Sequence, residues 1–259
     1  MNHSQAATRT QAHYDRLAPV YDLLGALMER SARRWRRLLW EEVGGESILE
    51  VGVGTGKNMP YYPEGPKITA IDLSEKMLHR AWRRAEQEGI EVELRQMDVQ
   101  ALAFPDKSFD TVVATFVFCS VPDPVQGLQE LGRVAKEKIL LLEHMSPESP
   151  RLGQLFDLLN PLVVRLFGFN INRRTLENIE RAGLKLERVQ DLDRLGIFKL
   201  IAARSGSASD STSNNKGLYR CPECGLEYKE KEWAEECERW CKQYKSCNPE
   251  IIKHAVERR

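Results

Sequence analysis

Ile48-Leu-Glu-Val-Gly-Val-Gly-Thr-Gly56 is the most informative stretch of the sequence, because a short apolar run leads into three glycines at alternate positions. Glycine lets the backbone turn sharply and approach a ligand where a Cβ atom would collide. We therefore expect a buried strand, a ligand-binding loop and then a helix. Asp72 closes the next apolar run, 22 residues after Glu50, where a carboxylate can accept hydrogen bonds from both hydroxyls of a ribose. A tight strand-to-helix turn without a ligand is the alternative.

Apolar runs alternate with stretches of helical periodicity on either side of this loop. Strands are predicted at 47–52, 67–72, 91–97, 111–118, 138–143 and 198–203. Helices are expected at 74–88, 124–135 and 173–182, with Ser74 capping the first of them, and the first 45 residues look helical. This alternation predicts an α/β fold with a doubly wound, mostly parallel sheet.

Composition and charge narrow the class of protein. The 259 residues carry 38 basic and 38 acidic side chains, so the surplus of positive charge that a nucleic-acid binder needs is absent. No apolar run approaches the roughly 18 residues of a membrane span, and the N-terminus has no apolar core of a secretory signal. These features predict a cytoplasmic protein.

The segment 205–217, SGSASDSTSNNKG, divides the chain. Ala208 is its only apolar side chain, so it cannot bury enough surface to offset the entropy of ordering, and we expect a flexible linker. The predicted organisation is an N-terminal helical lid at 1–45, a cofactor-binding domain at 46–204, the linker, and a cysteine-rich module at 218–259.

The glycine loop has the form G-x-G-x-G, with Glu50 two positions before its first glycine. A dinucleotide fingerprint would place its third glycine at Lys57, and a Walker loop is also absent. The pattern resembles motif I of the class I S-adenosylmethionine-dependent methyltransferases. That resemblance implies a seven-stranded Rossmann-like sheet, with the loop beneath the amino-acid part of S-adenosylmethionine and Asp72 on its ribose.

Further resemblances to this family follow in the expected order along the chain. Gln96-Met97-Asp98-Val99 resembles the segment whose acid faces the adenine, and 104–110 resembles the family's F-P-D-x-S-F-D entry to the fourth strand. Thr115 would end that strand beside the methionine portion. The cofactor-binding residues implied by the resemblance are Glu50, Gly52, Gly54, Gly56, Asp72, Leu73, Asp98, Val99 and Thr115.

The acceptor site has no comparable signature, and three segments are candidates for its lining. Tyr14-Asp-Arg-Leu-Ala-Pro-Val-Tyr-Asp22 resembles the lid of quinone-biosynthesis and phospholipid N-methyltransferases, which makes Tyr14 and Tyr21 candidate catalytic residues. A helix that only packs on the body is the alternative. His144 follows the fifth predicted strand, where it could accept a proton or serve a structural role.

The apolar insertion 156–173 is the third candidate. Its Asn160-Pro161 and Asn170-Ile-Asn-Arg173 pieces, with Cys119-Ser120-Val121, resemble a branch that contains animal thiol methyltransferases. Cys119 itself is interpreted as a packing residue. The acceptor stays open between an amine or phospholipid headgroup, a quinone-type carbon or oxygen, and a thiol. The competing class is a non-catalytic module that keeps the cofactor fold as a scaffold.

The segment 27–40 predicts a basic amphipathic helix. Leu27, Met28, Ser31, Trp35, Leu38 and Leu39 share one face, and arginines crowd the rest. Such a helix can lie on an anionic membrane, or it can be an ordinary surface helix with solvated arginines.

Five of the six cysteines crowd into the last 39 residues. Cys221, Cys224, Cys237 and Cys241 have the C-x2-C-x12-C-x3-C spacing of a ββα zinc finger with cysteines in place of its histidines, which predicts a structural zinc site. Cys247 and His254 are spare and could substitute as ligands. The nine basic and nine acidic residues of 217–259 make DNA binding a poor fit and favour docking to a protein partner. Capture of a soft metal or metalloid for methylation or detoxification is the rival interpretation.

Overall fold

The computed structural model describes residues 3–19, 26–147, 149–206, 219–221, 223, 226–244, 248, 251 and 253–255. The chain divides into two compact units, Met1–Ser205 and Gly206–Arg259, and each is described by itself.

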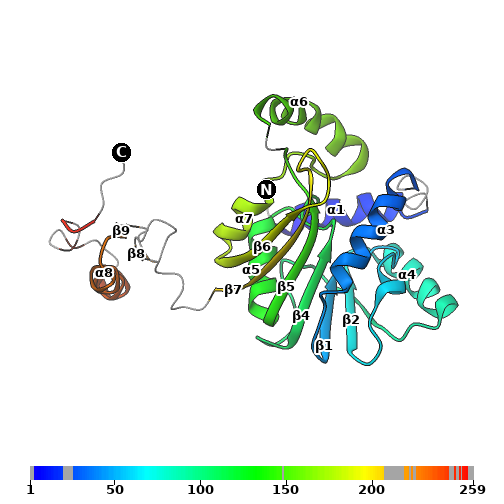
Figure 1. Ribbon diagram of the computed structural model, residues 1–259, viewed down its shortest axis with the longest axis horizontal. Coiled ribbons are helices and arrows are strands. Elements are labelled where there is room, and N and C mark those ends of the chain that lie inside the picture. Colours follow the sequence, from blue (N-terminus) through cyan, green and yellow to red (C-terminus); the bar gives the residue numbers. More distant parts are fainter. Residues whose placement is uncertain are drawn as a thin grey trace. The chain divides into compact units, whose positions relative to one another are not determined.

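A seven-stranded sheet forms the centre of the first unit (Figure 1). Its spatial order is β3-β2-β1-β4-β5-β7-β6, and β7 alone runs antiparallel to its neighbours. The strands are β1 (Ser47–Val51), β2 (Lys67–Asp72), β3 (Glu93–Gln96), β4 (Phe109–Thr115), β5 (Ala135–His144), β6 (Leu184–Asp191) and β7 (Phe198–Ser205). The predicted doubly wound, mostly parallel sheet is therefore confirmed, and the order reverses between β1 and β4, where such sheets bind ligands.

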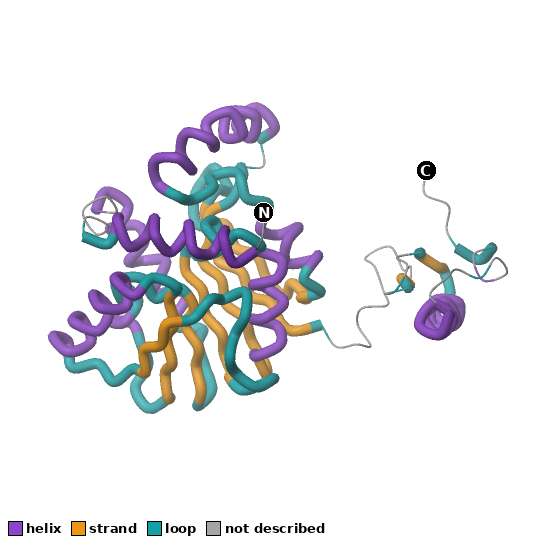
Figure 2. The backbone as a smooth tube through the Cα atoms, turned by 180° about the vertical axis from the view of Figure 1, so that it is seen from behind, coloured by secondary structure: helices purple, strands orange, loops and turns teal. Residues whose placement is uncertain are grey.

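Helices pack on both faces of the sheet (Figures 1 and 2). On one face, α3 (Ala26–Trp40) and α4 (Glu75–Glu88) cover alternate residues of β2, among them Ile68 and Ala70. On the other, α5 (Pro124–Val134) and α7 (Thr175–Arg181) bury Leu128, Leu131 and Ile179. Two further helices among the described residues of this unit are α1 (His3–Leu17) and α6 (Pro150–Phe167).

Two local predictions differ from the structure. The helix expected after the glycine loop is wrong: only the 3-10 turn η1 (Met59–Tyr61) forms there, because prolines at 60, 63 and 66 remove backbone donors within the ten residues that reach β2. Strand β6 was missed, since most of its residues are exposed at the sheet edge and show no buried alternation. Ser74 does cap α4, accepting a hydrogen bond from Met77 N at 3.2 Å.

The membrane interpretation of the basic helix 27–40 is wrong for the side chains that the structure describes. Trp35, Leu39 and Trp40 of α3 are buried against the sheet, so this apolar face is already covered. Arg36 is also buried and donates to Asn58 Oδ1 at 2.9 Å. The side chains of Leu27 and Met28 lie outside the described ones. Of the helices described, none has both the length and the apolar character to cross a bilayer.

The second unit contains a short hairpin and a helix. β8 (Tyr219–Arg220) pairs antiparallel with β9 (Glu227–Tyr228), and α8 (Lys231–Tyr244) follows. Cys221 N donates to Leu226 O at 2.8 Å and closes the hairpin. Its small core consists of Cys221, Tyr228, Ala234, Cys237, Cys241 and Ile251.

Candidate functional site

The glycine loop takes backbone conformations that side chains rarely tolerate. Gly52 has φ +66°, and a Cβ atom there would lie 2.4 Å from Val117 Cγ2. Gly56 has φ +80°, and its Cβ would lie 2.7 Å from Met59 Sδ. Gly54, with φ +57°, has open space instead. The loop thus packs against Val117, just after β4, and leaves open space at Gly54 for a ligand.

The Asp72 carboxylate at the end of β2 is held by backbone donors. Its Oδ2 accepts from Gly54 N at 2.8 Å and its Oδ1 from Ser74 N at 2.9 Å. Burial raises the pKa of Asp72 to about 6, against the lowering effect of these hydrogen bonds, and Asp15 adds to the rise. The carboxylate is therefore fixed in place with lone pairs left for a ligand's hydroxyls.

A pocket opens at the ends of β1, β2 and β4. Most of the predicted cofactor residues lie on its wall, together with Tyr14. The lining residues are Thr10, Tyr14, Gly52, Gly54, Ile71, Asp72, Leu73, Met77, Met97, Asp98, Val99, Thr115, Phe116, Val117, Ser120, Val121 and Pro122. Thr10 and Met77 were not anticipated, since neither stands in a recognisable motif.

Glu50 and Gly56, also predicted as cofactor residues, are not on the pocket wall. Glu50 is buried and accepts from Asn58 Nδ2 at 2.6 Å and from the Tyr62 hydroxyl. Asn58 Nδ2 also donates to Thr115 Oγ1 at 3.0 Å, which ties this network to the end of β4. Burial raises the pKa of Glu50 to about 7, with the two hydrogen bonds opposing. Glu50 therefore supports the loop from below.

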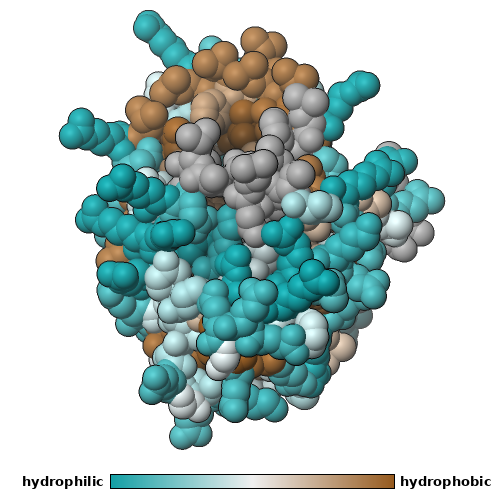
Figure 3. Space-filling model, turned by 90° about the vertical axis from the view of Figure 1, so that its right-hand side faces the viewer, coloured by the Kyte–Doolittle hydropathy of each residue, from teal (hydrophilic) through white to brown (hydrophobic). Residues whose placement is uncertain are grey.

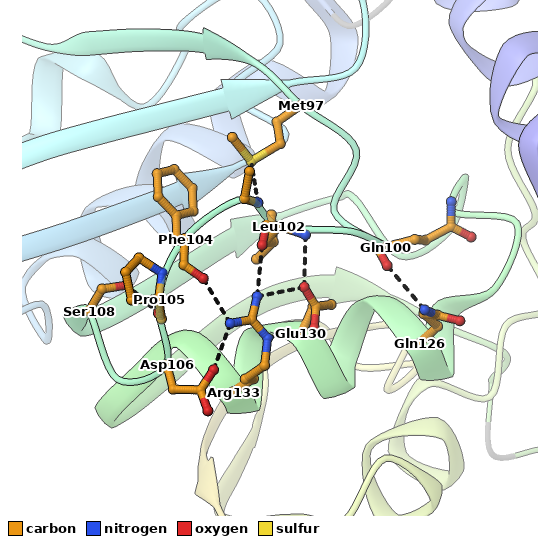
Figure 4. A network of polar contacts seen from close by, with 11 residues as sticks. Met97, Gln100, Leu102, Phe104, Pro105, Asp106, Ser108, Gln126, Glu130 and Arg133 are labelled. Carbon is orange, nitrogen blue, oxygen red and sulfur yellow. Dashed lines mark hydrogen bonds and ion pairs between the residues drawn. The ribbon is translucent and has the colours of Figure 1, made fainter.

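Asp98, the acid predicted to face an adenine, is held by the loop that follows β3. Gln100 donates from its backbone N to Asp98 Oδ1 at 2.9 Å and from Nε2 to both Asp98 oxygens at 3.0 Å. Gln126 Nε2 of α5 donates to Gln100 O at 3.2 Å (Figure 4). This chain of bonds fixes the carboxylate at the pocket edge.

Arg133 of α5 organises the family-like segment 104–110. Its Nη1 donates to Phe104 O and Asp106 Oδ1, both at 2.8 Å, and its Nη2 to Leu102 O at 2.8 Å (Figure 4). Glu130 receives two further bonds from the same guanidinium. The segment is thus a structural support for β4.

Helix α1 closes one side of the pocket with Thr10 and Tyr14. Asp15 Oδ1 accepts from Ser74 Oγ at 2.5 Å, next to Asp72. Arg80 Nη1 of α4 donates to Ala18 O at 2.5 Å. These polar contacts hold this helix over the pocket. Tyr21 lies outside the described residues.

His144 lies behind the pocket wall and is not among its lining residues. Its Nε2 is 3.0 Å from Asn170 O and therefore donates to that carbonyl, and the rings of Phe116, Phe169 and Phe198 surround it. Burial lowers the pKa of His144 below its usual value, which favours a neutral ring. The structure does not bring this residue to the cofactor pocket, and its catalytic role stays a prediction.

Glu143, which sequence reasoning missed, holds the pocket loop after β4. Its Oε1 accepts from Val117 N at 2.8 Å and Phe118 N at 3.0 Å, while its buried Oε2 has no hydrogen-bond partner in the described part of the chain. Burial raises the pKa of Glu143 to about 7. Burial also raises the pKa of the Cys119 thiol, which agrees with its interpretation as a packing residue. The signal available in the sequence for this residue was an acidic side chain near the end of an apolar run.

Three of the four predicted metal ligands come together in the second unit. The Sγ atoms of Cys221, Cys237 and Cys241 lie within 4.8 Å of one another, and Cys237 and Cys241 are 4.0 Å apart. A tetrahedral zinc with Zn–S bonds of about 2.3 Å needs sulfurs roughly 3.8 Å apart, so this donor set fits zinc. Cys224 and Cys247 lie outside the described residues. His254 stacks on Trp233, with centroids 3.6 Å apart, and is not in the cluster.

Comparison with known proteins gives matches in sequence and in structure. Residues 49–142 match the family described as "Methyltransferase domain". A phosphatidylethanolamine N-methyltransferase of Cereibacter sphaeroides is 40% identical over 138 residues, which are 52% of this chain and 68% of that protein. A demethylmenaquinone methyltransferase of Renibacterium salmoninarum is 35% identical over 143 residues, 52% of this chain and 59% of that protein.

The solved structure of the [4+2]-cyclase SpnF has the same fold. It superposes with a TM-score of 0.59 at 18% identity, over 75% of this chain and 96% of that chain. At this identity the likeness shows the fold alone, because one fold supports unrelated reactions.

Proposed function

The chain belongs to the class I S-adenosylmethionine-dependent methyltransferases, and from this premise we propose that it methylates a lipid-like acceptor, with the amine of a phospholipid headgroup first and a quinone ring second. The observation that carries the proposal is the pocket with its glycine loop, Asp72 and Asp98, in a chain so similar to a phosphatidylethanolamine N-methyltransferase. The demethylmenaquinone relative supports the second acceptor.

The pocket residues divide by the part of S-adenosylmethionine that each would hold. Asp72 would accept hydrogen bonds from the ribose hydroxyls, and Asp98 with Val99 would bind the adenine. Gly52, Gly54 and Leu73 would lie along the amino-acid portion. Thr115 would lie beside the sulfonium, which supplies an electrophilic methyl group when the cofactor is bound. Glu50 and Gly56 would act from beneath, by shaping the loop.

The chain's part in the reaction is alignment and exclusion of water. Tyr14 on α1 and Phe116 after β4 both line the pocket, so an acceptor between them would meet the methyl group away from solvent. An amine acceptor would need its lone pair to take up a methyl group, so its ammonium form would first have to lose a proton. His144 could accept that proton only through Nδ1, because Nε2 donates to Asn170.

Label transfer from S-adenosylmethionine tests the acceptor. The purified chain is incubated with labelled cofactor and vesicles that contain either phosphatidylethanolamine or demethylmenaquinone. We expect label in N-methylated phospholipid. Label only in the quinone would replace the first acceptor by the second, and label in neither would reject both, provided that the chain binds the cofactor.

For the second unit we propose a structural zinc held by Cys221, Cys237 and Cys241, with Cys224 as the fourth ligand. The three described thiols support this site through their spacing, and a unit with so small a core gains folding energy from metal binding. We also propose that 205–217 is a flexible linker and that the zinc-bound unit docks a protein partner.

A further inference from the structure

Helix α6 carries an apolar stripe that faces solvent. Leu155, Leu158, Leu159 and Leu162 are 46%, 76%, 42% and 56% exposed, and their i, i+3, i+4, i+7 spacing places them on one side of the helix. Figure 3 shows apolar side chains gathered at the top of that view, over α6. A soluble helix normally turns such a stripe toward a core, and here the opposite side faces the protein.

The protein-facing side of α6 is anchored by polar contacts. Asn160 Oδ1 accepts from Ile171 N at 2.9 Å, and Asn160 Nδ2 donates to Asn170 Oδ1 at 3.1 Å. Asp157 Oδ1 accepts from Asn172 Nδ2 at 2.8 Å. These hydrogen bonds fix which side of the helix faces the protein, so the leucines on the opposite side are held toward solvent.

The charges on α6 complement an anionic surface. Arg151 lies four residues before Leu155 and Arg165 three residues after Leu162, so both exposed arginines flank the leucine stripe on the same side. The one acid of the helix, Asp157, is turned toward Asn172. Leucines with arginines at both ends are the arrangement by which interfacial helices bind anionic bilayers.

The same helix stands beside the cofactor pocket. Asn170, which Asn160 contacts, donates from Nδ2 to Cys119 O at 2.9 Å, and the next residue, Ser120, lines the pocket. Directly after the C-terminal end of α6, Gly168 packs against His13 of α1, one residue before the pocket residue Tyr14. A surface that contacts α6 is therefore close to both the pocket loop and the helix that closes it.

We propose that the leucine stripe of α6 docks on a bilayer with anionic phospholipid, so that the acceptor enters the pocket from the membrane. The docking is inferred from the exposed leucines and arginines of α6. Only the claim that the acceptor enters from the membrane rests on the proposed function.

Co-sedimentation of the full chain with vesicles tests the docking without cofactor or acceptor. The vesicles contain phosphatidylcholine alone or with phosphatidylglycerol. The variants are Leu158→Ser/Leu162→Ser, Arg151→Gln/Arg165→Gln, and the control Leu195→Ser, whose side chain is 57% exposed in the loop between β6 and β7.

We expect the double leucine variant to lower the partition coefficient on the order of tenfold to a hundredfold, and Leu195→Ser to leave it unchanged. The arginine variant is expected to lose the preference for phosphatidylglycerol. Equal binding by the double leucine variant, or a wild-type chain that stays in the supernatant, would overturn the proposal. A wild-type dimer that the leucine variant converts to a monomer would assign the stripe to a second copy instead.

Methylation of a short-chain acceptor dispersed as monomers separates the two proposals. If the leucine variant methylates it like the wild type and fails only on vesicles, docking is the affected step. If neither protein methylates it although the wild type binds vesicles, the proposed function fails and the docking stands.

Discussion

At the scale of single residues, the pocket depends on carboxylates that the fold has partly removed from water. Near strand ends, Glu50 and Glu143 are buried and Asp72 is half-buried, and burial is the main cause that raises the pKa of each. Their positions differ: Asp72 faces the pocket, whereas Glu50 and Glu143 each hold one of the two loops that shape it. The same chemical group thus serves binding in one place and support in two others.

Asp72→Asn should weaken S-adenosylmethionine binding roughly tenfold to a hundredfold, because a charged acceptor of the ribose hydroxyls is lost. In the wild type, the pKa of about 6 means that affinity falls as the pH drops through about 6 and the carboxylate is protonated. Titration calorimetry across this range measures both effects. Asp106→Asn, an exposed carboxylate outside the pocket, is the control, and equal weakening by it would count against the assignment.

Glu50 should make stability fall as the pH rises. Its folded pKa of about 7 exceeds the unfolded value of 4.5, so the free energy of unfolding declines between these pH values, by roughly 3 kcal/mol. Glu50→Gln removes this decline, and urea unfolding of both proteins at the two ends of the range measures it. Glu130 is the control with the opposite sign. The hydrogen bond from Arg133 lowers its pKa, so the stability that its carboxylate contributes is lost as the pH falls, and Glu130→Gln should remove this pH dependence. A wild-type profile parallel to that of Glu50→Gln would contradict the prediction.

At the scale of elements, polar contacts with α4 hold α1 over the pocket. Asp15 meets the N-terminus of α4 through Ser74 Oγ, and Arg80 of α4 meets the C-terminal end of α1 through Ala18 O. Because Thr10 and Tyr14 of this helix line the pocket, we expect its contacts with α4 to affect how fast a cofactor enters and leaves.

Asp15→Ala should speed S-adenosylmethionine dissociation by about fivefold, which corresponds to the loss of one hydrogen bond. It should also lower the pKa of Asp72, because Asp15 contributes to raising it, and so shift the pH midpoint of binding downward. Stopped-flow displacement measures the rate. Lys76→Ala keeps the backbone N–H that also faces Asp15 and serves as the control. An unchanged rate and midpoint would mean that α1 is a packing helix only.

At the scale of the whole molecule, the two compact units depend on different sources of stability. The first has a sheet with helices packed on both faces, whereas the core of the second, among its described residues, has six buried members, three of them cysteines. Removal of zinc should therefore affect the second unit alone.

We expect one zinc ion per wild-type chain and strongly reduced zinc in Cys237→Ser, by metal analysis after dialysis. S-adenosylmethionine affinity should be the same in both, because the pocket residues belong to the first unit. Cys119→Ser should keep the metal. Its thiol lies near Glu143 and His144, and loss of zinc from this variant would place the ion there instead.

The sequence determined the features that depend on neighbours in the chain. The glycine loop, Asp72 and Asp98 stand at fixed distances from buried strands, so strand periodicity alone brought them to one edge of the sheet. The Ser74 cap and the approach of Cys237 to Cys241 are equally local. The absence of a helix after the loop could also have been found from the spacing of its prolines.

Only the tertiary structure decided which faces are covered. The amphipathic pattern of α3 fits packing on a core or on a membrane equally well. In the structure the sheet covers Trp35, so the apolar face of this helix is part of the core. The stripe on α6 is exposed because Asn160 and Asp157 hold the opposite side of the helix. Glu143 became a support because β4 and β5 end together. A sequence encodes the period of each element, but the partner of each face comes from contacts between residues far apart in the chain.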